Sequence, residues 1–197
     1  TIENRKTLIS LVERIAANIN IPFTVGGGIN SVGDVGQLLK AGADKITINS
    51  AAVRQPELVK ALAGEFGSQC VVVAIDTNFI NQQWLVYVDG GRTPTELRTN
   101  EWAEKVTNLG AGEILLTSMN NDGTKSGFSI DITGEISSRI NIPVIASGGA
   151  GTMEHFKEVF FNTDCSAALA ASIFHFGEIG IKNLKEYLDN EGIAVML

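Results

Sequence analysis

Apolar and polar positions along this chain follow two alternating rhythms. Short runs with a period of two, typical of strands, are separated by longer stretches with apolar residues three and four positions apart, typical of amphipathic helices. The pattern predicts six strands, over residues 22–25, 45–49, 70–76, 113–117, 143–146 and 166–171. It also predicts seven helices, over residues 5–18, 31–40, 56–66, 100–109, 130–139, 153–161 and 181–190. Strands alternating with helices of this length indicate a parallel sheet built from right-handed βαβ units.

One insertion interrupts this alternation. Residues 79–93 contain two short strand-like pieces on either side of Asn81 and Gln82. We interpret this insertion as a hairpin on the loop that follows the third predicted strand.

The sequence contains an internal repeat. The segment INIPFTVGGG at residues 19–28 returns as INIPVIASGG at residues 140–149, and each copy leads through a helix to a strand with a small polar end. Glycines after a strand let backbone N–H groups approach an anion closely, although glycine also serves simply to make tight turns. Two matching copies predict two phosphate-binding turns, at residues 26–28 and 147–149, and suggest one ligand with two phosphates.

The alternation within the strands favours a closed barrel. Lys45, Thr47 and Asn49 share one strand face, and Ile46 and Ile48 share the other. Small and polar inner residues with branched outer residues fit a (β/α)8 TIM barrel with an internal two-fold repeat better than an open sheet. Such a barrel has eight strands in roughly 250 residues. We therefore expect one barrel domain over residues 1–197, N-terminally incomplete, with six of eight strands present.

Composition narrows the classes of function and partner. The net charge of −7 argues against nucleic acid or an anionic membrane as a partner, and any phosphate must be held by local N–H groups and hydroxyls. Cys70 and Cys165 fall in predicted buried strands, where free thiols fit a reducing, cytoplasmic location. His155 and His175 are helix-surface or cap residues without further ligands at metal-binding spacing, so no metal site and no cofactor are expected.

The ends of the predicted strands carry the candidate chemistry. Asp76 is the one carboxylate at the C-terminal end of a predicted strand, where it is either a general acid/base or a turn-capping residue. The glycine- and hydroxyl-rich loop at residues 120–127 is a mobile lid, a phosphate loop or an ordinary surface turn. Lys45 and Glu113 begin strands and should face inward at the opposite end of the barrel. An ion pair there is either structural or a gate across the barrel axis.

Eight short motifs follow one another along the chain: FTVGGGI (23–29), GADK (42–45), INSAA (48–52), VAID (73–76), GEILLTS (112–118), DGTKSG (122–127), ASGGAG (146–151) and AASIFHF (170–176). Together they resemble the cyclase subunit of imidazole glycerol phosphate synthase, an enzyme of histidine biosynthesis, and DGTKSG is a specific signature. The resemblance implies a (β/α)8 barrel that receives ammonia from a glutaminase bound at its N-terminal face. The enzyme converts bisphosphorylated ribulosylformimino-aminoimidazole-carboxamide ribonucleotide into imidazole glycerol phosphate and aminoimidazole-carboxamide ribonucleotide.

The resemblance also implies roles for individual residues. Asp76 matches the family's acid/base on the fifth barrel strand, and Lys45 and Glu113 match two members of the charged ammonia gate. The residues that match one phosphate site are Gly28, Asn49 and Ser50. The residues that match the other are Gly123, Gly149, Ala171 and Ser172, with Thr117 and Asp122 bordering the substrate.

The chain also departs from the family pattern. The family's second catalytic aspartate follows the first strand, a segment expected to be missing here, so the chain alone should be inactive. Residues 161–165 read FNTDC where the family has a Gly-Ala-Asp turn.

Two alternative functions remain open. The sister isomerase of the pathway shares the fold, the repeat and a bisphosphate ligand, but the loop at residues 122–127 and the pair Lys45/Glu113 favour the cyclase. A non-catalytic phosphate-binding fragment is the other alternative, which the sequence upstream of Thr1 would decide.

Overall fold

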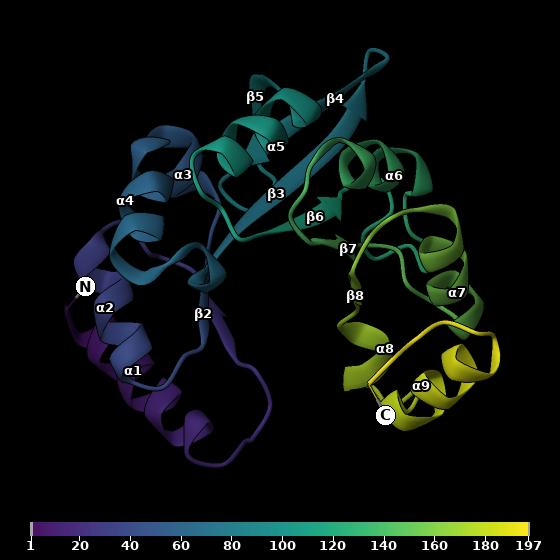
Figure 1. Ribbon diagram of the computed structural model, residues 1–197, viewed down its shortest axis with the longest axis horizontal. Helices are drawn as coiled ribbons and strands as arrows, with labels where there is room; N and C mark the ends of the chain where they lie inside the picture. Colours follow the sequence, from purple (N-terminus) through teal and green to yellow (C-terminus); the bar gives the residue numbers. More distant parts are fainter. Residues whose placement is uncertain (1, 197) are drawn as a thin grey trace. The chain divides into compact units, whose positions relative to one another are not determined.

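The computed structural model describes residues 2–196, with side chains from residue 8 onward. Six strands follow one another through the sheet in sequence order, as Figure 1 shows: β1 (Thr24–Gly26), β2 (Lys45–Ile48), β3 (Val71–Ile80), β6 (Glu113–Ser118), β7 (Val144–Ser147) and β8 (Ala167–Leu169). Strands β1, β2 and β3 pair in parallel, and so do β6, β7 and β8. This order confirms the six predicted parallel strands and the alternation with helices that is typical of a (β/α)8 barrel.

The chain forms two compact units. The N-terminal unit comprises Thr1–Ala74 and Lys105–Glu113, and the C-terminal unit comprises Ile75–Glu104 and Ile114–Leu197. Strands β3 and β6 and helix α5 (Thr99–Asn108) contribute residues to both units. The expectation that residues 1–197 are a single barrel domain stays a prediction.

In the N-terminal unit, helices cover a core of branched side chains. The elements are α1 (Ile2–Ala16), α2 (Val32–Lys40), α3 (Ser50–Arg54), α4 (Glu57–Phe66) and the 3-10 helix η1 (Ser68–Cys70). Helix α2 begins at Ser31, whose hydroxyl accepts the N–H of Asp34 at 3.2 Å. In β2, Ile46 and Ile48 are buried whereas Lys45 and Thr47 are half-buried. This burial confirms the predicted alternation of the strand.

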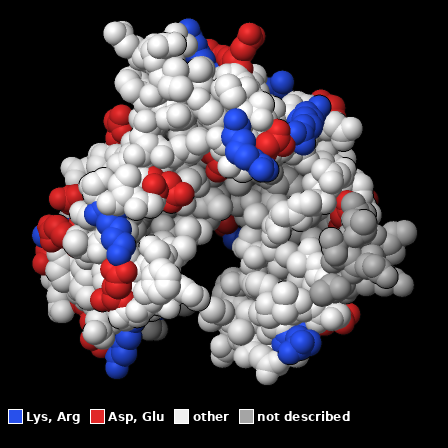
Figure 2. Space-filling view, turned by 180° about the vertical axis from the view of Figure 1, so that it is seen from behind, with Lys and Arg blue, Asp and Glu red and all other residues white. Residues whose placement is uncertain are grey.

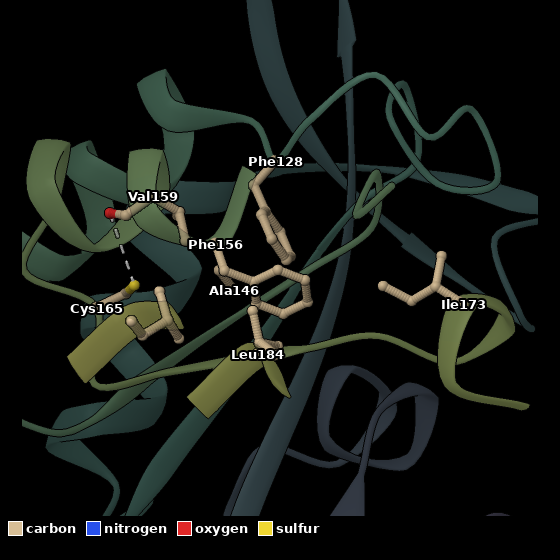
Figure 3. Packing of buried hydrophobic residues seen from close by; sticks show 8 residues of the cluster. Phe128, Ala146, Phe156, Val159, Cys165, Ile173 and Leu184 are labelled. Atoms are coloured by element: carbon tan, nitrogen blue, oxygen red, sulfur yellow. Dashed lines mark hydrogen bonds between the residues drawn. The ribbon is translucent and has the colours of Figure 1, made fainter. Parts of the chain in front are cut away.

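In the C-terminal unit, one apolar cluster joins the sheet to its helices. The helices are α6 (Ile130–Arg139), α7 (Met153–Asn162), α8 (Ser172–His175) and α9 (Ile181–Asn190). Figure 3 shows Phe128, Phe156 and Leu184 meeting around Ala146 of β7, and the two phenyl rings pack edge to face at 5.3 Å. Ile173 of α8 is fully buried in the same cluster. Phe174 of α8 packs against the same cluster, with its ring 6.0 Å from that of Phe156, so two side chains anchor this short helix to the core.

The predicted hairpin is confirmed and is longer than expected. Strand β3 runs on to Ile80 and pairs in antiparallel fashion with β4 (Gln83–Val88). The turn residues Asn81 and Gln82 both have left-handed backbones, with φ of 48° and 60°, as two-residue hairpin turns require. Strand β4 also pairs with β5 (Thr93–Arg98), which was not predicted. The side chains of β5 are mostly exposed and polar, so the strand carries no apolar alternation.

Three other local features differ from the predictions. Helices α3 and α8 are too short to show a helical period, and they were not predicted. Cys70 lies in η1 and is half-buried, because its N–H bonds to the carbonyl of Gly67 at 3.2 Å and closes a turn before β3 begins. Cys165 is buried as expected, but it lies in the segment before β8. Both cysteines are free thiols.

The buried thiol gives a pH-dependent prediction. Burial raises the pKa of Cys165, so the folded protein keeps this proton to a higher pH than the unfolded chain, whose thiols titrate near about 8.5. The free energy of unfolding should therefore fall as pH rises above about 8.5, until the folded-state pKa is passed. Urea unfolding between pH 7.5 and 10 should show a smaller fall in the free energy of unfolding for Cys165→Ala than for the unchanged protein. If the free energy of unfolding falls with pH equally steeply in Cys165→Ala and in the unchanged protein, this prediction is wrong.

The surface carries charges of both signs. On the face shown in Figure 2, basic and acidic side chains lie in small mixed groups. Within residues 2–196, no helix is both long and apolar enough to cross a membrane. In the same described part of the chain, no group of three or more His, Cys, Asp or Glu residues is placed to hold a metal ion.

Candidate functional site

In the C-terminal unit, the strand ends place accessible side chains in one row. Thr117 of β6 pairs with Ser147 of β7, which in turn pairs with Leu169 of β8. The N–H of Met119 donates to the carbonyl of Thr77 at 2.8 Å, which sets Asp76 of β3 and Thr117 at adjoining positions. Asp76, Thr117 and Ser147 are all half-buried, whereas Thr77 and Ser118 are buried on the other side of the sheet. The candidate acid/base therefore lies on the accessible face of the strands.

A cavity of about 210 Å³ adjoins the β7 and β8 end of this row. Its walls come from the loop after β6, the turn after β7, and the end of β8 with the start of α8. The lining residues are Asp122, Gly123, Lys125, Ser147, Gly148, Gly149, Ala150, Leu169, Ala170, Ala171 and Ser172. The volume is below the roughly 300–1,000 Å³ of pockets for drug-sized ligands, and it suits a single small group. The cavity thus brings together Gly123, Gly149, Ala171 and Ser172, which match one phosphate site of the family, and Asp122, which is expected to border the substrate.

The turn after β7 must consist of glycines because the loop after β6 packs directly on its backbone. The N–H of Gly127 donates to the carbonyl of Gly149 at 2.8 Å. A Cβ at Gly149 would lie 2.0 Å from the carbonyl oxygen of Gly127, and a Cβ at Gly148 would lie 2.7 Å from that of Ser118. Both glycines also have positive φ, at 92° and 101°. Main chain therefore forms this wall of the cavity.

Internal hydrogen bonds define the conformation of the loop after β6. The Nδ2 of Asn121 donates to the carbonyl of Gly127 at 2.9 Å, and the hydroxyl of Ser118 donates to Oδ1 of Asn121 at 3.0 Å. The hydroxyl of Thr124 donates to the carbonyl of Asn121 at 2.6 Å. The loop is therefore folded on itself as well as packed against the turn.

The charge around the cavity is nearly balanced. Lys125 carries the only cationic side chain among the lining residues, and its Nζ donates to both carboxylate oxygens of Glu178, at 2.6 and 2.7 Å. An anion in the cavity would meet mainly backbone N–H groups rather than an excess of positive charge, as the net charge of the chain suggests. Ser147 belongs to the phosphate-binding turn predicted at residues 147–149, and Lys125 belongs to the candidate loop at residues 120–127. Glu178 was not singled out from the sequence, which gives no signal for it.

The N-terminal unit repeats the local arrangement of the turns. Gly28 lies two residues past the end of β1, just as Gly149 lies two residues past the end of β7, and both have positive φ. Strands β1 and β2 pair in parallel, as β7 and β8 do. A short helix begins at Ser50 after β2 and at Ser172 after β8. Gly28, Asn49 and Ser50 thus occupy the positions at strand ends that the internal repeat predicts.

Lys45 and Glu113 form the predicted ion pair at the first residues of β2 and β6. The Nζ of Lys45 donates to Oε1 of Glu113, and the two side chains are 28% and 19% exposed. Both residues belong to the N-terminal unit. The ion pair is confirmed, and a gating role for it stays a prediction.

The partial burial of this ion pair predicts a measurable contribution to stability. In a double-mutant cycle of Lys45→Met and Glu113→Gln, the coupling free energy should be about 1–3 kcal/mol, since hydrogen bonds to charged groups fall in that range. The exposed pair Arg98 and Glu101, with nitrogen and oxygen 3.9 Å apart, is the control and should couple by less than about 0.5 kcal/mol. Urea unfolding measures both values, and equal coupling in the two cycles would refute the prediction.

Besides Cys165, the titratable groups whose pKa is clearly shifted lie on the surface of α7 and α9. The hydroxyl of Tyr187 donates to the carboxylate of Glu154, which lowers the pKa of Glu154 and raises that of Tyr187. Glu191 accepts from Lys157 at 2.8 Å and raises the pKa of that lysine. None of these four residues lines the cavity, so this network joins two helices.

The model of the family described as "Histidine biosynthesis protein" matches residues 1–180. The imidazole glycerol phosphate synthase subunit HisF of Parabacteroides distasonis is 56% identical over 195 residues, covering 99% of this chain and 78% of that protein. The subunit HisF of Flavobacterium johnsoniae is 56% identical over 197 residues, and that of Bacillus cereus is 56% identical over 198 residues. Each of these two matches covers 100% of this chain, and 78% and 79% of the relative.

These matches extend over essentially the whole chain and over 78% of the length of the relatives. The family model agrees with the parallel strand order of the sheet. The chain therefore belongs to the HisF family, the cyclase subunits of imidazole glycerol phosphate synthase in histidine biosynthesis.

Proposed function

We propose that the protein, as the organism makes it, uses ammonia to convert bisphosphorylated ribulosylformimino-aminoimidazole-carboxamide ribonucleotide into imidazole glycerol phosphate and aminoimidazole-carboxamide ribonucleotide. One observation carries this proposal: the residues assigned to a phosphate site from sequence motifs line one cavity of about 210 Å³. Membership of the HisF family supplies the reaction. The internal repeat adds a second glycine turn, at residues 26–28 in the N-terminal unit. The chain therefore has two such turns, and the substrate has two phosphates.

Backbone and hydroxyl groups would hold each phosphate. In the C-terminal unit the donors are N–H groups of Gly123, Gly149 and Ser172 with the hydroxyl of Ser172, and in the N-terminal unit they come from Gly28 and Ser50. Hydrogen bonds to a charged acceptor contribute roughly 1.5–3 kcal/mol each. Several such bonds would hold a phosphate without a cluster of basic residues.

Asp76 is the proposed general acid/base. A half-buried carboxylate on the accessible strand face can accept or donate a proton to a substrate that is held at the adjoining cavity. Thr117, at the adjoining position on β6, and Asp122, on the cavity wall, would border the same substrate. Asp76 would move protons during ring closure while these neighbours orient the reacting atoms.

The name of the relatives describes a subunit, which implies a partner. We propose that the partner is a glutaminase that binds the N-terminal face of the barrel, where Lys45 and Glu113 begin their strands. Their ion pair would then be part of the gate through which ammonia enters. The expected location of the assembly is the cytoplasm.

A reaction assay separates this proposal from its alternatives. The protein, as the organism makes it, is incubated with the bisphosphorylated substrate, with and without an ammonium salt, and the products are identified by mass spectrometry. Formation of imidazole glycerol phosphate only with ammonium supports the cyclase. Isomerisation of the preceding pathway intermediate without ammonium would support the sister isomerase instead. Phosphate binding with neither reaction would indicate a non-catalytic binding protein.

A further inference from the structure

An ion pair bridges two walls of the cavity in the C-terminal unit. Lys125 belongs to the loop after β6, and Glu178 follows α8, 53 residues later in the chain. The lysine Nζ contacts both carboxylate oxygens, at 2.6 and 2.7 Å. The side chains are 45% and 40% exposed, so the pair lies at the rim of the cavity. No other ion pair in the described part of the chain includes a residue that lines this cavity.

The backbone of Glu178 is fixed to the core. Its N–H donates to the carbonyl of Ile173 at 2.9 Å, and the N–H of Gly177 donates to the carbonyl of Phe174 at 3.1 Å. With Gly177 at a φ of 69°, these two bonds form a Schellman motif at the end of α8. Because Ile173 is fully buried and Ser172 beside it lines the cavity, Glu178 is held at a set position relative to that wall.

The backbone of Lys125 is fixed to the loop in an unusual conformation. Lys125 has a φ of 58°, a left-handed value that a lysine rarely adopts without support from its surroundings. A Cβ on Gly151 would lie 2.4 Å from the carbonyl oxygen of Lys125, so the main chain at Lys125 packs directly on the segment between the turn and α7. The backbone from which the lysine side chain projects is therefore fixed, and Gly123 is only two residues away.

We infer that Lys125 and Glu178 act as a rim clasp, an ion pair that positions the loop after β6 against α8 so that Gly123 and Ser172 present donors to one phosphate. This inference rests on the proposed phosphate site. Lys125 is here a positioning residue, because Glu178 already matches its charge and occupies two of its three N–H donors. The alternative role, in which Lys125 binds the phosphate directly, predicts the opposite response to removal of Glu178.

Three variants distinguish the two roles: Lys125→Met, Glu178→Gln, and the exchange of Lys125→Glu with Glu178→Lys. The probe is inorganic phosphate, and binding is read from the amide NMR shifts of Gly123, Gly149 and Ser172. Loss of the ion pair can change the equilibrium between loop positions by no more than the free energy of that pair. Each single variant should therefore weaken phosphate binding by up to about fivefold. The exchanged pair should restore the affinity to within about twofold.

Amide hydrogen exchange gives a second readout that needs no ligand. The N–H of Gly127 is bonded to Gly149 across the contact between loop and turn. The rate of hydrogen exchange at this amide should rise in both single variants, and the factor should be the same in the two. In the double variant with the two charges swapped, the rate should return toward the value of the unchanged protein. The control is the ion pair of Lys157 and Glu191, at 2.8 Å in the same unit but outside the cavity. Lys157→Met and Glu191→Gln should change neither the affinity nor the exchange rate.

The possible outcomes separate the inference from the proposed function. Tighter phosphate binding by Glu178→Gln, or failure of the exchanged pair to recover, would overturn the clasp in favour of direct binding by Lys125. Unchanged exchange at Gly127 in both single variants would overturn it as well. If the three amides of the unchanged protein do not respond to phosphate, the proposed function fails, while the exchange rates still decide whether the pair holds the loop.

Discussion

Asp76→Asn should lower the rate of ammonia-dependent cyclisation by about 10²–10⁴-fold, the usual contribution of one general acid/base. The amide has nearly the same shape as the carboxylate but cannot accept the proton, so binding of the bisphosphate should change little. The loss should therefore appear in kcat rather than in KM. The measurement is steady-state turnover of the protein as the organism makes it, with an ammonium salt as the nitrogen source.

A surface aspartate provides the control for this variant. Asp189 lies exposed on α9, outside the residues that line the cavity. Asp189→Asn removes the same charge and should leave turnover unchanged. Wild-type rates in Asp76→Asn would exclude Asp76 as the acid/base, and an equal loss in both variants would point to net charge instead.

Gly149→Ala should have the largest effect on both stability and binding. The added methyl group would lie 2.0 Å from a backbone oxygen, which cannot rotate away, and the position has a φ of 101°. Backbone strain and overpacking together should lower the free energy of unfolding by about 2–5 kcal/mol. Displacement of even one phosphate donor should lower the affinity for inorganic phosphate by about 10–100-fold. Urea unfolding and a phosphate titration measure the two effects.

Gly192→Ala is the matched control for backbone strain. Gly192 also has a positive φ, at 82°, but a Cβ there would meet nothing within 4 Å. Its substitution should cost only about 1 kcal/mol and should not affect phosphate binding. If Gly149→Ala behaves like Gly192→Ala in both measurements, the close contact between loop and turn does not shape the phosphate site.

The helices and strands in which apolar residues recur with a clear periodicity were predictable from the sequence. Helix α9 has the predicted bounds, because Leu184 and Leu188 lie four residues apart on its buried face and Gly180 precedes it. Strand β2 was recognisable because buried isoleucines alternate with half-buried polar residues. Strand β5 could not be predicted, because its partner β4 supplies the hydrogen bonds while its own side chains stay mostly exposed.

The candidate site was predictable to the extent that it follows from strand order. Parallel strands end at the same edge, so glycines after β7 and small residues after β8 had to lie close together. The pairing of Lys125 with Glu178 depends on a left-handed backbone at one residue and a helix end at the other. Neither conformation is encoded by residue spacing, and a separation of 53 residues gives no local signal.

The contact between Gly127 and Gly149 bears on how the protein could be re-engineered. The hydrogen bond across this seam joins two main-chain groups, and the side chain that supports it is that of Asn121, whose Nδ2 donates to the carbonyl of Gly127. Ser126 is exposed beside the seam, and larger or charged replacements there should be accommodated without loss of the fold. A library randomised at position 126 could therefore search for altered substrate choice next to an intact cavity, whereas one that included position 149 would consist mainly of misfolded proteins.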